Sequence, residues 1–214
     1  LTDIPGIAGH LLAASVMSAP AALVVAKIIY PETQLSETMG NLKINVEKTS
    51  SNAIEALSNG ATDGLKLAAN VAAMLVAFIS MVAMGNYLLG FANTSIDQIL
   101  GLIFQPLAWT MGVPWEESAM IGTLMGKKIA FTELIAYGDL KDIIASGQIS
   151  ERTAIIASYA LCGFANFGSI GIQLGGIGGM APKRKKDLTK LVTKAMIGGA
   201  LASWLTATVA GLLI

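Results

Sequence analysis

Four long apolar segments constrain this chain more than any other feature of its sequence. They cover residues 7–30, 67–91, 154–179 and 191–214. A helix that crosses the hydrocarbon core of a bilayer needs about 20 mostly apolar residues. Each segment reaches or approaches that length, so the sequence predicts an all-α integral membrane protein with about four transmembrane helices.

The composition favours the same fold class. Of the 214 residues, 54% are hydrophobic and 13% are charged, whereas a soluble domain usually has about a quarter charged residues. The formal net charge is zero, and Cys162 is the one cysteine. We therefore expect a multi-pass protein of the lipid bilayer, with no nucleic-acid partner and no disulfide framework within the chain. Because the sequence has no metal-ligand spacing, nucleotide loop or nucleophile elbow, we expect neither an enzyme nor a cofactor.

Basic residues in the connecting loops predict the orientation of these helices. Loops rich in lysine and arginine stay on the cytoplasmic side, and five such residues lie within 183–190. The later half of the polar connector 31–66 has the spacing of an amphipathic helix, which lies at the interface or leads into the second span. The alternative is a plain solvated connector. We expect three parts: scaffold helices with a cytoplasmic connector (31–66) in 1–92, an outer-side interfacial helix and re-entrant hairpin in 93–150, and an unwound substrate-binding helix with the final span in 151–214.

Residues 114–146 contain two apolar arms that are each too short to cross a bilayer. The short polar element Thr132 and Glu133 separates them, a pattern that predicts a re-entrant helical hairpin with this element at its tip. A carboxylate at membrane depth is costly unless it is paired or hydrated, so Glu133 is a candidate substrate-binding residue. The alternative is a surface amphipathic helix with Glu133 among the lipid headgroups, which the nearby Lys127 and Lys128 favour.

Seven glycines lie within residues 163–179, inside the third apolar segment. Each glycine weakens a helix by about 1 kcal/mol relative to alanine, and the run at 175–179 weakens it further, so we expect a helix that is unwound near the midplane. Asn166 and Ser169 lie three residues apart and face the same way in a helical turn, and Phe164 can supply a flat apolar wall. These groups suit a neutral, hydroxyl-rich solute. The alternative is that the small and polar residues pack helices together.

Four stretches together resemble the concentrative nucleoside transporter family: GHLLAASVMSAPAAL (9–23), SNAIEALSNGATDGLKLAANVAAML (51–75), FTELIAY (131–137) and YALCGFANFGSIGIQLGG (159–176). They occur in order, cover nearly the whole chain and correspond to the C-terminal region of that family. The resemblance implies a symporter of the cell inner (plasma) membrane that takes up nucleosides with sodium or, in some bacterial members, with protons. It also implies a homotrimer, in which each protomer has a scaffold part and a mobile transport part with two re-entrant hairpins and two partly unwound helices.

The resemblance further implies roles for individual residues. Glu133 matches the carboxylate at the tip of the family's second hairpin, which binds the ribose hydroxyls. Asn166 and Ser169 match a ribose-facing polar pair on the unwound helix, and Phe164 matches an aromatic residue of the same pocket. Thr132 departs from the family pattern, in which asparagine commonly precedes this glutamate. The role of the carboxylate therefore carries over, whereas a side-chain amide at the hairpin tip does not.

Part of the family's machinery has no counterpart in this sequence. We expect the first hairpin, its unwound partner helix and the main coupling-cation site to lie upstream of Leu1, in a longer protein of which this chain is the later part. On that expectation the chain does not transport by itself. Two other functions stay open from the residues alone: a transporter of another small polar solute, such as a free base or a sugar, and a non-transporting membrane subunit whose glycines pack helices.

Overall fold

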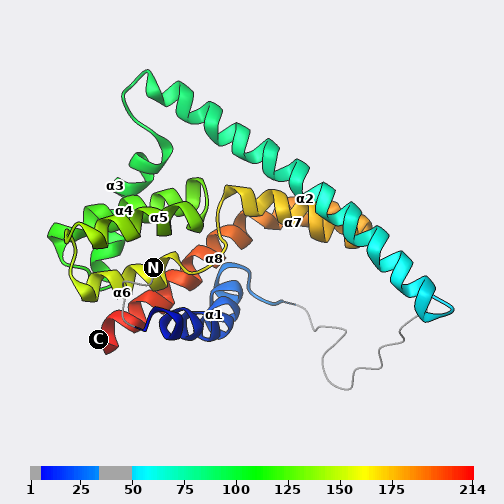
Figure 1. The fold of residues 1–214 in the computed structure, drawn as a ribbon, viewed down its shortest axis with the longest axis horizontal. Helices are drawn as coiled ribbons and strands as arrows, with labels where there is room; N and C mark the ends of the chain where they lie inside the picture. Colours follow the sequence, from blue (N-terminus) through cyan, green and yellow to red (C-terminus); the bar gives the residue numbers. More distant parts are fainter. Residues whose placement is uncertain (1–5, 34–49) are drawn as a thin grey trace.

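The computed structural model describes residues 6–33 and 50–214, and Figure 1 shows them as an assembly of helices without β-strands in this part of the chain. Residues 34–49, within the predicted connector, lie outside the described residues. The described helices are α1 (Ile7–Ile29), α2 (Ala53–Gly90), α3 (Ile96–Thr110), α4 (Trp115–Ala130), α5 (Glu133–Ala145), α6 (Glu151–Leu161), α7 (Phe167–Met180), the short 3₁₀ helix η1 (Pro182–Arg184) and α8 (Lys185–Leu213). The all-α prediction is therefore confirmed.

Three of the described helical segments are long and apolar enough to cross a bilayer: α1, α2, and η1 with α8 as Pro182–Leu213. The predicted third span consists of two shorter helices, α6 and α7, joined by residues 162–166. A break is thus present in this segment. It does not lie at the glycine run 175–179, as glycine propensity alone predicts, because that run is part of α7.

The helix α2 begins well before the predicted second span. The Asn52 side chain accepts a hydrogen bond of 2.9 Å from the Glu55 N–H and so satisfies one of the free donors at the helix start. The amphipathic helix predicted in the connector is therefore the first part of α2. Figure 1 shows α2 as a long rod that projects past the other helices, and Val82 is its one buried residue. The large apolar side chains that α2 exposes need lipid or further protein around them.

The glycines of α7 allow this helix to lie directly against α2. A Cβ added at Gly171 would lie 3.1 Å from the Met74 carbonyl oxygen, and one added at Gly175 would lie 3.3 Å from the Asn70 carbonyl oxygen. Small residues let membrane helices approach this closely. For these two glycines the packing interpretation is correct, and the close contact between the helices offsets their low helix propensity.

The helices α3 and α4 pack even more closely along one another. A Cβ added at Gly122 would lie 2.6 Å from the Gly101 carbonyl oxygen and 2.8 Å from the Gln105 backbone nitrogen. No side chain can be accommodated there unless the two backbones separate. The segment predicted as an interfacial helix therefore forms one side of a tight helix pair.

The main hydrophobic core lies where α3, α4, α5 and α6 meet α8. It is at the end of the molecule away from the N-terminal end of α2 (Figure 1). The helix α1 lies against α8 on another side. Core side chains come from each of these five helices and include Ala108, Ile121, Met125, Leu140, Ile156, Leu161 and Ala207. This core fixes α4 and α5 relative to the broken helix that follows them.

Candidate functional site

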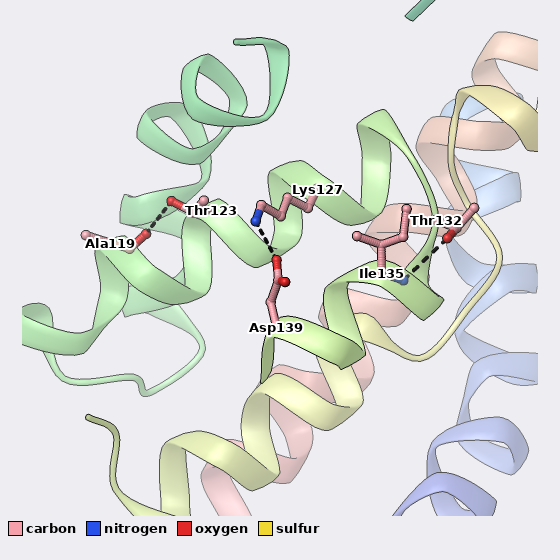
Figure 2. A network of polar contacts seen from close by, with 6 residues as sticks. All are labelled: Ala119, Thr123, Lys127, Thr132, Ile135 and Asp139. Atoms are coloured by element: carbon pink, nitrogen blue, oxygen red, sulfur yellow. Dashed lines mark hydrogen bonds and ion pairs between the residues drawn. The ribbon is translucent and has the colours of Figure 1, made fainter. Parts of the chain in front are cut away.

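The segment 114–146 forms a helical hairpin. Two residues, Phe131 and Thr132, connect α4 to α5, and the Phe131 N–H donates to the Lys127 carbonyl oxygen at 2.8 Å. Figure 2 shows the ion pair between Lys127 and Asp139 that joins the two arms. Nine residues of α4 are buried within the described structure, so this arm does not lie on the surface of the protein as a lone amphipathic helix. The depth of this hairpin in the membrane stays a prediction.

The Thr132 hydroxyl caps the N-terminus of α5, as the side chain of an asparagine at this position could also do. The Thr132 side chain accepts a hydrogen bond of 3.5 Å from the Ile135 N–H (Figure 2). Threonine and asparagine are both favoured N-cap residues. The departure from the family pattern therefore keeps the hairpin tip capped and leaves Glu133 in the first turn of α5.

We expect Thr132→Ala to lower the free energy of unfolding by about 1 kcal/mol, because it removes this cap, and Thr132→Asn to change it by only a few tenths. Thermal unfolding in detergent checks both variants against the wild type. If both variants are equally destabilised, the side chain of residue 132 does not act as a cap.

The break between α6 and α7 places a second helix N-terminus near the hairpin tip. The chain leaves α6 in an extended conformation at Cys162, and Gly163 has φ of 125°, a value that only glycine adopts readily. Asn166 then caps α7. Its side-chain oxygen accepts from the Ser169 N–H at 2.8 Å, while the Ser169 hydroxyl oxygen accepts from the Asn166 N–H at 3.2 Å. This reciprocal capping box fixes where α7 begins.

One contact joins the hairpin tip to the broken helix. The Asn166 Nδ2 atom donates to Glu133 Oε2 at 3.5 Å, across 33 residues of sequence. Asn166 is fully buried, whereas Glu133 is half-buried. Both residues stand at helix N-termini, where the helix dipole and free N–H groups favour a carboxylate or another acceptor. The structure therefore brings together two of the four residues predicted from sequence.

The other two predicted residues lie beside this contact in different ways. Phe164 lies in the break and is 50% exposed, as a residue that forms an open apolar wall would be. Ser169 is buried, and its hydroxyl donates to the Asn166 carbonyl oxygen at 2.6 Å. In this conformation the Ser169 hydroxyl is bonded to the Asn166 backbone, and the Asn166 side-chain amide is the group that points to Glu133.

Lys128 is a residue of this region that sequence analysis did not assign to the site. Its side chain is fully buried and donates to the Ala160 carbonyl oxygen at 2.9 Å and to the Ser203 hydroxyl at 2.7 Å. The sequence shows this charge within an apolar arm, where it favours the alternative of a surface helix. Among the described residues, no group of three histidine, cysteine or acidic side chains could hold a metal ion.

Comparison with known proteins gives the family. The family model described as "Na+ dependent nucleoside transporter C-terminus" matches residues 10–211. The chain belongs to this nucleoside transporter family. The resemblance inferred from the sequence motifs is thereby confirmed.

Several known proteins are about 40% identical to this chain. The uncharacterized transporter YutK of Bacillus subtilis is 43% identical over 213 residues, which are 96% of this chain and 52% of the relative. The nucleoside permease NupC of Helicobacter pylori is 41% identical, over 96% of this chain and 51% of the relative. Human solute carrier family 28 member 3 is 40% identical, over 95% and 33%. The chain thus spans about half the length of these bacterial relatives.

Solved structures of the transporter CNTnw share the fold. A variant in an outward-facing state matches with a TM-score of 0.83 at 39% identity, over 95% of this chain and 50% of that chain. The inward-facing substrate-bound state matches with a TM-score of 0.72 at 41% identity, over the same shares of the two chains. The helices of this chain are therefore arranged more like those of the outward-facing variant.

Proposed function

We propose that the chain forms the substrate-binding C-terminal part of a cation-coupled nucleoside symporter. The observation that carries the proposal is the contact between Glu133 on the hairpin tip and Asn166 at the start of α7. The family supports both the transported class and coupling to sodium. A site built from two helix N-termini at a helix break is also a common arrangement in secondary transporters.

In this proposal the nucleoside is held by its ribose. The carboxylate of Glu133 accepts hydrogen bonds from two ribose hydroxyls, which are stronger than bonds to a neutral acceptor because the acceptor is charged. The Asn166 amide donates to a ribose oxygen once the solute displaces its long bond to Glu133, and Phe164 packs against the flat or apolar face of the solute. The Ser169 hydroxyl keeps Asn166 in place, and the remaining lone pair of its oxygen can accept a hydrogen bond from the solute.

The transport cycle follows from the same arrangement. The hairpin and the broken helix move together against the scaffold helices and expose the site to either side in turn. We propose a homotrimer in the plasma membrane, with sodium or protons as the coupling cation.

Calorimetric binding to the protein expressed at its natural length tests this function. We expect nucleosides to bind and to be displaced by excess nucleoside, whereas free ribose and free base compete poorly because each makes half of the contacts. Binding in sodium but not in choline would identify sodium as the coupling ion, and binding in both would favour protons. A solute that is recognised as a free base or as a sugar would replace nucleosides as the substrate class.

A further inference from the structure

Lys128 is a charged side chain at a position where proteins usually place an apolar one. It is fully buried in the described structure, and replacing buried charges with apolar residues of similar size is often neutral or stabilising. The two oxygens that Lys128 contacts explain why a charge is placed there. They come from α6 and α8, so its ammonium joins three helices: α4, α6 and α8.

The contact with α6 is made at the break itself. The Ala160 carbonyl is one of the last four of α6, whose intrahelical partners are lost where the helix ends. The Lys128 ammonium supplies a donor for this carbonyl, and a cation is favoured at a helix C-terminus. A Cβ added at Gly163, in the break, would lie 3.9 Å from Lys128 Nζ. The ammonium therefore lies against the turn through which the chain passes to Asn166.

The contact with α8 is equally well defined. Ser203 is buried, and its hydroxyl accepts from Lys128 while donating to the Ala200 carbonyl oxygen at 2.8 Å. The acceptor of the ammonium is thus oriented by its own helix. Lys128 also lies near the end of α4, five residues before Glu133. The two hydrogen bonds of Lys128 fix the position of the hairpin tip relative to the break between α6 and α7.

We propose that Lys128 is a positioning residue for nucleoside recognition: it holds the hairpin tip in register with the broken helix, so that Glu133 and Asn166 face the same ribose. The proposal rests on the proposed function. Lys128 does not touch the solute. It sets the distance between two groups that do, and its loss weakens the recognition of the ribose hydroxyls more than the binding of the rest of the nucleoside.

Two ligands separate positioning from a general structural role. One is uridine or adenosine, and the other is the dideoxynucleoside with the same base, which lacks both secondary ribose hydroxyls. For wild type at natural length we expect the ribonucleoside to bind roughly 100-fold more tightly, since two hydrogen bonds to a charged group are lost in the analogue. In Lys128→Met this ratio should fall about tenfold or more, with the affinity for the dideoxynucleoside within about threefold of wild type.

Lys127→Met is the matched control, because Lys127 is the adjacent residue of α4 and pairs with Asp139 instead. In this variant the ratio of ribonucleoside to dideoxynucleoside affinity should equal that of wild type. Ser203→Ala removes one of the two hydrogen-bond acceptors of Lys128 and keeps its charge. It should therefore reduce the ratio of the two affinities by a smaller factor than Lys128→Met. If Lys128→Met does not fold, Ser203→Ala provides the test of the positioning role.

An unchanged ratio in Lys128→Met, or equal weakening of both ligands, would overturn the positioning role while leaving nucleoside binding established. With an unfolded Lys128→Met protein, an unchanged ratio in Ser203→Ala would do the same. If the wild-type protein binds neither ligand, the proposed function fails first and this inference fails with it.

Discussion

Replacing Glu133 with glutamine is expected to weaken nucleoside binding by roughly 100-fold. Glutamine has nearly the same shape but offers a neutral oxygen and an amide in place of the carboxylate. Hydrogen bonds to a charged acceptor exceed those to a neutral one by about 1–1.5 kcal/mol each. The bonds to two ribose hydroxyls therefore lose about 2–3 kcal/mol, which corresponds to roughly 30- to 150-fold in Kd. Calorimetry on the protein at natural length measures the difference, and uptake into proteoliposomes should fall with it.

Glu116→Gln provides the matched control for this experiment. Glu116 is also in the first turn of a hairpin helix, α4, but it is exposed and lies at the end of α4 away from the hairpin tip. The same change of charge there should leave the Kd within about twofold of wild type. If Glu133→Gln binds nucleosides as well as Glu116→Gln does, the carboxylate is not the group that recognises the ribose.

The second large effect is expected on folding, at Gly122. Its added Cβ would lie 2.6 Å from the Gly101 carbonyl oxygen, and backbone atoms cannot move aside as a flexible side chain can. Gly122→Ala should therefore separate α3 from α4 and cost about 3 kcal/mol, at the upper end of overpacking effects. In detergent, this corresponds to a fall in the apparent Tm of roughly 5–10 °C.

Gly138→Ala is the same substitution on the other arm of the hairpin. Nothing lies within 4 Å of the Cβ that would be added at Gly138, so the higher helix propensity of alanine should raise stability by up to about 1 kcal/mol. Equal Tm values for Gly122→Ala and Gly138→Ala would mean that α3 and α4 are not in close contact in the folded protein.

The helices and the hairpin could be predicted from sequence because their signals are local. The two apolar arms around Thr132 and Glu133 predict a hairpin whose connection the structure places at Phe131 and Thr132. The first span is predicted to within one residue, as α1 ends at Ile29. Apolar length and a polar interruption are properties of a short window, so no knowledge of the rest of the fold is needed to recognise them.

The remaining features depend on contacts between distant segments. Glycine propensity predicts that the run at 175–179 weakens the helix. The run nevertheless stays helical in α7, where its first residue, Gly175, packs against Asn70 of α2. From sequence alone Lys128 favours a surface helix, because the sequence cannot show that α6 ends beside it. The pairing of Glu133 with Asn166 was suggested by the family resemblance, and a distance of 3.5 Å between their side chains needs the fold.

The most direct test of the account is a cryo-electron microscopy structure of the natural-length protein with a bound nucleoside. We predict that the ribose hydroxyls lie within about 3.2 Å of the Glu133 carboxylate and the Asn166 amide, with Phe164 against the solute. A nucleoside bound elsewhere, or bound with its base rather than its ribose at Glu133, would contradict the account.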